Sequence, residues 1–172
     1  NCLGYMNFPA RVSMFLGRAV EGTLRVGHVA VVGQSGATTE VIVTKLLRRG
    51  LGISLYATTG NEAVMTVEDC LEYLVHDPET KVITGFFEGF RNIPKLEAVA
   101  RAAARRQVPI LMIKVGRSAK AVQAAKSHTG ALAGNDAVLD AILRQWGILR
   151  VDTIEELAEA ANLFIHCPLP RG

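Results

Sequence analysis

Short apolar runs alternate with longer segments of helical spacing along most of the chain. The apolar runs are rich in Val and Ile and are bounded by Gly, Pro or polar residues, so each predicts a buried strand. These runs cover residues 29–32, 52–57, 82–87, 110–115 and 148–151. Elsewhere apolar residues recur every three or four positions, which is typical of helices that cover a core. The expected helices cover residues 38–49, 67–75, 95–107, 137–146 and 154–164.

Strand and helix alternate five times, which predicts a parallel sheet with helices on both faces. Because the crossovers in such sheets are right-handed, few topologies remain. We therefore expect an α/β domain over residues 28–166, with three layers. Its five-stranded parallel sheet has the flavodoxin-like (Rossmann-like) strand order 2-1-3-4-5. Residues 1–27 show no clear periodicity and predict an extended segment, and the Pro-rich residues 167–172 predict a linker.

Composition supports a globular domain and excludes several classes of partner. Apolar residues make up 49% of the chain, charged residues 20% and aromatic residues 6%, as expected for an aliphatic core around a parallel sheet. The net charge of +3 includes no basic stripe, so nucleic-acid binding is not expected. No apolar run approaches the roughly 18 residues of a membrane span. Three widely spaced cysteines form no metal-binding framework, and we expect reduced thiols in a cytoplasmic protein without a metal.

Polar residues follow the predicted strands at the edge where a ligand would bind. Ligands of parallel sheets sit outside the carboxyl ends of the strands. Ser35 follows the first expected strand, Asn61 the second, Glu88 the third and His128 the fourth. The convergence of these four residues at one edge of the sheet predicts a functional site there. Asn61 is also compatible with a simple turn.

The first expected helix begins differently from two later ones. The helices near 67 and 154 start with Thr followed closely by acids, as in a capping box. By contrast, Ser35, Gly36, Ala37 and Thr38 bring no acid into the first turn. A helix N-terminus without its own anion predicts a phosphate site. The alternative is an ordinary serine cap. Because the motif has no Walker lysine, it is not an NTP-binding P-loop.

One histidine lies in a run of small residues, Ser-His-Thr-Gly-Ala-Leu-Ala-Gly at 127–134. Such a run allows tight turns and close approach to the imidazole of His128. A histidine that accepts a phosphoryl group needs an acceptor on its other ring nitrogen, and Glu88 is the best candidate. A surface histidine and a solvated acid are the alternatives. Lys114 and Arg117 could steer phosphate or a carboxylate, or simply cover the loop.

Several motifs, taken in order, resemble one enzyme family. They are Asn-Cys-Leu-Gly at 1–4, Gly-Gln-Ser-Gly at 33–36, Gly-Asn at 60–61, Glu-Gly at 88–89, Gly-Arg-Ser at 116–118 and the histidine motif at 127–134. Together they resemble the histidine-bearing flavodoxin-like domain of NDP-forming acyl-CoA synthetases, the superfamily of succinyl-CoA synthetase. The histidine motif resembles the branch of ADP-forming acetyl-CoA synthetases.

The resemblance implies a phosphohistidine relay. His128 would be the nucleophile and carrier, Glu88 would orient it, and the helix start at 35–38 with Thr129 and Gly130 would bind phosphoryl oxygens. The full enzyme is expected to use CoA, ADP or ATP, phosphate and Mg, whereas this domain binds no cofactor tightly. Its partners would be a CoA-binding domain, which residues 1–27 would link to it, and an ATP-grasp domain. The domain is expected to be inactive alone, and an oligomer is compatible with the sequence.

Two other functions remain open at the level of sequence. Ligase-like domains also occur as regulatory modules of protein acyltransferases, where they act as sensors. The segment 35–40 loosely resembles a flavodoxin phosphate loop, so FMN binding is a third hypothesis. It gives His128 no role, and Trp146 lies in a helical pattern rather than in a loop that could shield a flavin.

Overall fold

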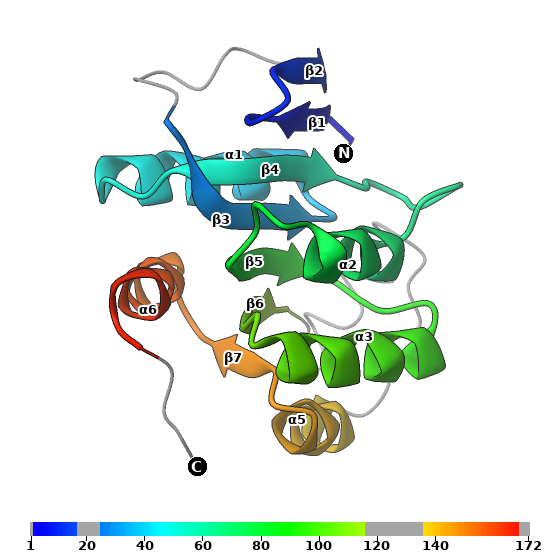
Figure 1. Cartoon of the computed structure of the whole chain (residues 1–172). Coiled ribbons are helices and arrows are strands. Elements are labelled where there is room, and N and C mark those ends of the chain that lie inside the picture. Colours follow the sequence, from blue (N-terminus) through cyan, green and yellow to red (C-terminus); the bar gives the residue numbers. More distant parts are fainter. Residues whose placement is uncertain (1, 17–24, 116–135, 169–172) are drawn as a thin grey trace.

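The computed structural model describes residues 2–16, 25–115 and 136–168 (Figure 1). Within these ranges seven strands form one sheet in the order β2-β1-β4-β3-β5-β6-β7. The strands are β1 (Gly4–Asn7), β2 (Val12–Phe15), β3 (Val26–Gly33), β4 (Ile53–Thr58), β5 (Val82–Phe87), β6 (Ile110–Lys114) and β7 (Leu149–Val151). The described helices are α1 (Gly36–Arg48), α2 (Val67–His76), α3 (Ile93–Arg106), α5 (Asp136–Gln145) and α6 (Ile154–His166).

The helices cover both faces of the sheet and make three layers (Figure 1). One hydrophobic cluster joins the sheet to α2, α3 and α5, and a second joins it to α1 and α6. Every residue of β4 and of β6 is buried. Strands covered on both faces need apolar side chains at successive positions, which explains the continuous apolar runs in the sequence. No helix in the described ranges has the length and apolar character needed to cross a membrane.

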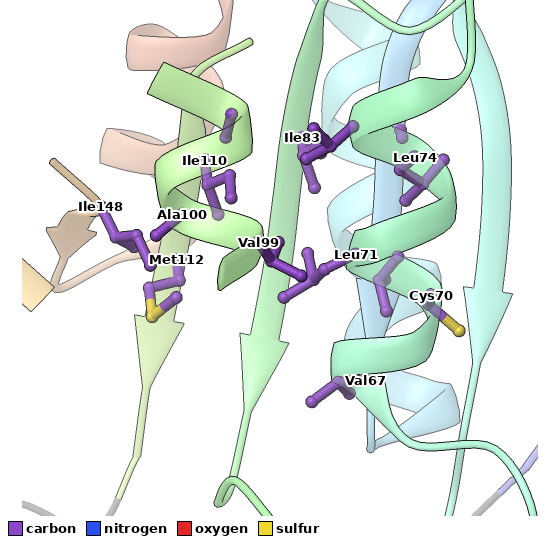
Figure 2. Close-up of a cluster of buried hydrophobic side chains, with 14 of the residues drawn as sticks. Val67, Cys70, Leu71, Leu74, Ile83, Val99, Ala100, Ile110, Met112 and Ile148 are labelled. Atoms are coloured by element: carbon purple, nitrogen blue, oxygen red, sulfur yellow. The ribbon is translucent and has the colours of Figure 1, made fainter. Parts of the chain in front are cut away.

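Side chains of α2 and α3 point onto the sheet and toward one another (Figure 2). Leu71 of α2 is fully buried and Val99 of α3 is 3% exposed, and both belong to the cluster that includes Ile83 of β5 and Met112 of β6. Burying a side chain of this size contributes about 1.5–3 kcal/mol. This cluster fixes α2 and α3 on the sheet, and thereby the loops that precede them.

The predicted strands and their order are confirmed. β3, β4, β5, β6 and β7 correspond to the five expected strands, and they lie in parallel in the expected order 2-1-3-4-5. The expectation of a five-stranded, purely parallel sheet is wrong. β1 pairs antiparallel with β4, and β2 pairs antiparallel with β1, so residues expected to be merely extended add two strands to the edge.

Local hydrogen bonds explain why this hairpin attaches to the sheet. The hydroxyl of Thr58, at the end of β4, accepts from the backbone N–H groups of Leu3 and Gly4 at 2.7 and 3.0 Å and donates to Gly4 O at 3.1 Å. Gly4 has a φ of +102°, and a Cβ there would lie 1.9 Å from Met14 O. Only glycine allows the two hairpin strands to meet at this point.

Candidate functional site

The carboxyl ends of four neighbouring strands meet at one edge of the sheet. Gly33 at the end of β3 pairs with Thr58 of β4 on one side and with Phe86 of β5 on the other. Phe87 of β5 pairs with Lys114 of β6. The residues that follow these strands, including three predicted site residues (Ser35, Asn61 and Glu88), and Lys114 itself therefore lie along one edge, as predicted.

Ser35 caps α1, as in the ordinary serine cap that the sequence offered as the alternative to a phosphate site. Its hydroxyl accepts from Thr38 N at 3.4 Å and lies 3.0 Å from Thr38 Oγ1, and the first turn of α1 contains no acidic residue. Tyr56 of β4 is fully buried beneath this turn and donates to Gly36 O at 3.4 Å. Burial raises the pKa of Tyr56, so its hydroxyl keeps its proton and remains a donor. The first turn of α1 thus carries no anion of its own.

The close contact between α1 and the sheet requires glycine at position 33. A Cβ on Gly33 would lie 2.1 Å from Thr39 Oγ1 and 3.2 Å from Phe86 O. Thr39 is itself fully buried, and its hydroxyl donates to Ser35 O at 2.5 Å. The Gly-Gln-Ser-Gly turn therefore brings the amino end of α1 down onto the ends of β3 and β5.

The other helix starts in the described ranges differ in detail. α2 has the predicted capping box, in which Asp69 accepts from Thr66 N at 2.7 Å. At α6 the box is incomplete, because Glu156 accepts from Asp152 N at 2.8 Å and not from the capping Thr153. α3 also lacks an acid in its first turn. The acid-free start of α1 is therefore informative because of where it lies, at the edge of the sheet beside Glu88.

Gln34 joins the α1 turn to the loop that carries Glu88, and sequence reasoning did not select it. Its side chain is 2% exposed. Gln34 Oε1 accepts from Glu88 N at 2.5 Å and from Gly89 N at 3.1 Å, while Nε2 donates to Gly89 O at 2.9 Å. One amide side chain thereby satisfies three backbone groups of the loop and holds Glu88, which is 8% exposed, next to the start of α1.

Lys114 places a buried cation on the other side of Glu88. The residue is 8% exposed, and its ammonium donates to Val115 O. Burial lowers the pKa of Lys114, with Arg150 lowering it further, whereas the charges of Asp136 and Glu88 raise it. The Glu88 carboxylate and the Lys114 ammonium are thus near enough to interact electrostatically at the ends of adjacent strands.

Asn61 takes part in a different arrangement, on the loop between β4 and α2. Arg91 donates to Asn61 O at 2.9 Å and, through Nε, to Glu62 Oε2 at 3.0 Å. Glu62 has a φ of +56° and accepts from Val67 N at 2.8 Å. Asn61 also lines an apolar hollow of about 870 Å³ beside the hairpin, together with Cys2. These contacts favour the turn role for Asn61.

The remaining predicted site residues lie outside the described residues. These are Arg117, His128, Thr129 and Gly130. The described part of the edge therefore supplies the helix start, the acid and the lysine of the predicted site.

Comparison with known proteins identifies the family. The family model for the succinyl-CoA ligase-like flavodoxin domain matches residues 26–164. The chain belongs to this family. It is 38% identical over 171 residues to an ADP-forming 4-hydroxybutyrate–CoA ligase of Nitrosopumilus maritimus, and 34% identical over 172 residues to the alpha subunit of ADP-forming acetate–CoA ligase II of Pyrococcus furiosus.

Solved structures agree with this assignment. The structure of the dinucleotide-forming acetyl-CoA synthetase 1 of Ca. Korarchaeum cryptofilum in complex with phosphate and ADP matches with a TM-score of 0.88 and 31% identity. The match covers 99% of this chain and 36% of that one. The two sequence matches cover 99% and 100% of this chain but only 24% and 36% of the relatives. The chain thus spans a quarter to a third of the enzymes that it resembles.

Proposed function

We propose that this domain is the phosphohistidine relay of an NDP-forming acyl-CoA ligase. The observation that carries the proposal is the link through Gln34, which holds Glu88 against an acid-free helix start in a member of a family of acyl-CoA ligases. The overall reaction would convert acyl-CoA, phosphate and ADP reversibly into the free acid, CoA and ATP. CoA and nucleotide would bind mainly to parts of the protein beyond these residues, because the chain spans only a part of its relatives.

The reaction would pass through two phosphorylated species. Phosphate attacks the thioester carbonyl, so a C–O bond forms, the C–S bond breaks and CoA leaves as the thiolate. A ring nitrogen of neutral His128 then attacks phosphorus, and the carboxylate of the acid leaves with the electrons of the P–O bond. Finally the phosphoryl group passes from His128 to ADP. The residues at the edge of the sheet described above would act in both steps in which His128 gains or gives up the phosphoryl group.

Each residue at this edge would have a chemical task in these two steps. The Glu88 carboxylate would accept the N–H of the other ring nitrogen, which fixes the tautomer and stabilises the cation that develops on phosphorylation. The backbone amides of Gly36 and Ala37 with the hydroxyls of Ser35 and Thr38 would bind phosphoryl oxygens. An anion at a helix N-terminus gains about 0.3–1 kcal/mol when exposed and up to ~2 kcal/mol when partly buried.

Three further groups would complete the site. Thr129 and Gly130, next to the histidine, would add donors to phosphoryl oxygens, and Arg117 would supply positive charge. The buried ammonium of Lys114 would compensate the charge of Glu88 when no cation is present on His128. Asn61 is the least central of the proposed residues, because its described contacts belong to the β4–α2 loop.

The test is phosphorylation of the full-length protein by Mg-ATP, scored as acid-labile and base-stable label. We expect label on the wild type, none on His128→Asn, and full label on His76→Asn, a matched control at an exposed position at the end of α2. Glu88→Gln should lower the rate of labelling by about 10²–10⁴. Label that persists in His128→Asn would refute the relay, and no label on folded wild-type protein would favour the regulatory-module hypothesis.

A further inference from the structure

Arg150 of β7 is a buried arginine at the same edge, and the proposed chemistry gives it no role. Its side chain is 5% exposed. Arg150 pairs in register with Met112 of β6, so its side chain starts from the strand next to the one that ends in Lys114. Burying a guanidinium costs free energy unless anions and carbonyls surround it. The partners of Arg150 should therefore show which parts of the structure it holds.

Those partners lie on either side of the segment that carries the histidine motif. Arg150 Nη2 donates to Lys114 O at 3.0 Å and to Asp136 Oδ1 at 2.9 Å. Lys114 is the last residue of β6, and Asp136 is the first residue of α5. The nitrogen has two hydrogens, one for each acceptor. A single amino group thus joins the strand before residues 116–135 to the helix after them.

The geometry at Asp136 favours arginine over lysine. Arg150 Nη1 donates to Asp136 Oδ2 at 3.1 Å, so the guanidinium and the carboxylate form a two-point contact. Nη1 also lies 3.5 Å from Asp140 Oδ1, one helical turn later. A planar guanidinium can serve two carboxylates and a carbonyl at once, whereas an ammonium is a point charge on a flexible stem.

The start of α5 is less buried than its end. Leu143, near its end, is the one residue of α5 that is fully buried, and Val138 in the first turn is 55% exposed. The ion pairs of Arg150 therefore contribute directly to holding the first turn of α5, whereas β6 is already held by pairing with β5 and β7. Loss of Arg150 should release the helix end of the segment and leave the strand end in place.

We propose that Arg150 is a positioning residue that ties the two ends of segment 116–135 together and so sets where His128 is presented to the phosphoryl group. The effect on rate rests on the proposed function, whereas the tie itself does not. A reacting group displaced by about 1 Å loses on the order of 10²-fold in rate. Holding the two ends of this segment in place should therefore raise the rate of phosphoryl transfer.

The experiment uses the full-length protein with Arg150→Ala, Arg150→Lys and a matched control, Arg144→Ala. Arg144 also pairs with Asp140, but it is 80% exposed and lies within α5, away from both ends of the segment. Melting temperatures and far-UV circular dichroism establish that each variant is folded. Trypsin then reports on the tie directly, because Arg117 and Lys126 offer cleavage sites inside the segment.

We expect Arg150→Ala to speed cleavage inside segment 116–135 by about tenfold, since local opening becomes easier. We expect labelling of His128 and kcat to fall by between about ten- and a hundredfold, with KM for ADP unchanged. Arg150→Lys should lie between wild type and Arg150→Ala, and Arg144→Ala should match wild type. If Arg150→Ala does not fold, Arg150→Lys carries the comparison.

The outcomes separate this inference from the proposed function. Folded Arg150 variants that match Arg144→Ala in both cleavage and labelling would overturn the inference. Faster cleavage together with an absence of label on the wild type would refute the relay and retain the tie. The inference would also be overturned if kcat falls only in proportion to the fraction of unfolded protein and cleavage below the melting transition does not change. Arg150 would then stabilise the fold without positioning the segment.

Discussion

Replacement of Gln34 by leucine should destabilise the domain far more than the change in one side chain suggests. Leucine is similar in size but removes the acceptor and the donor together. Glu88 N, Gly89 N and Gly89 O would then be left without the partner that the structure gives them. Because both residues are buried, water cannot readily replace Gln34.

The expected magnitude follows from these three groups. A buried polar group that loses its partner costs about 1–3 kcal/mol, so three groups give an upper range of about 3–9 kcal/mol. The loop can shift toward solvent, and the leucine side chain regains about 1 kcal/mol or more of apolar transfer energy. We therefore expect Gln34→Leu to lower the free energy of unfolding by about 3–5 kcal/mol, a large part of the 5–15 kcal/mol typical of a domain.

The assay is urea denaturation followed by far-UV circular dichroism. Gln145→Leu is the matched control, because Gln145 is exposed at the end of α5, and it should change stability by less than about 0.5 kcal/mol. Gln34→Glu should fall between the two, since a carboxylate can still accept from both N–H groups but repels Gly89 O. A loss of less than about 1 kcal/mol in Gln34→Leu would refute the reasoning that this side chain holds the loop.

Three other predictions concern the sheet and two titrating groups. Gly85→Ala would place a Cβ 2.6 Å from Val32 O and should cost about 2–4 kcal/mol by thermal melting, against about 1 kcal/mol for Gly147→Ala, where φ is +73° and nothing lies within 4 Å. Burial lowers the pKa of Lys114 below 10.5. Between the lowered pKa and 10.5 the unfolded chain binds more protons than the folded one, so the melting temperature should rise as pH increases through this range. Lys114→Met should reduce that rise. Hydrogen bonds, chiefly from Lys95, lower the pKa of Asp69 from 3.8 to about 2. The contribution of Asp69 to stability is therefore complete above pH 3.8 and is lost as pH falls toward 2. Asp69→Asn should show a smaller fall in melting temperature over that interval, and a fall equal to that of the wild type would contradict the assignment.

The sequence predicted the parallel part of the sheet because burial on both faces leaves a local signal. β4 and β6 are buried at every position, so their apolar runs stand out without any knowledge of their neighbours. The hairpin was missed because its strands are short and β2 is largely exposed. The Asn-Phe-Pro sequence between two apolar stretches was a turn signal that could have found it, and in the structure Asn7 Oδ1 accepts from Ala10 N at 3.0 Å.

The residues that hold the site together left no comparable signal. Gln34, Glu62 and Arg150 act through contacts with residues far along the chain, at separations of 55, 29 and 36 positions. Neither periodicity nor local spacing reports such contacts. Glu88 and Lys114 were found because a charged residue at the end of an apolar strand is conspicuous, whereas an amide in a turn is not.

The polar side chains at this edge differ in what they hold, and this bears on which of them can do chemistry. Glu68 is fully buried and accepts from Arg91 N and Asn92 N at 2.7 and 2.8 Å, so its carboxylate is used to fix a loop. Gln34 is used in the same way. The backbone N–H of Glu88 donates to Gln34. Replacing the Glu88 carboxylate by an amide leaves this backbone contact in place, whereas the same change at Glu68 alters the group that accepts from Arg91 N and Asn92 N. If Glu88→Gln is inactive in labelling yet melts like the wild type, the carboxylate acts on the reaction itself and not on the fold.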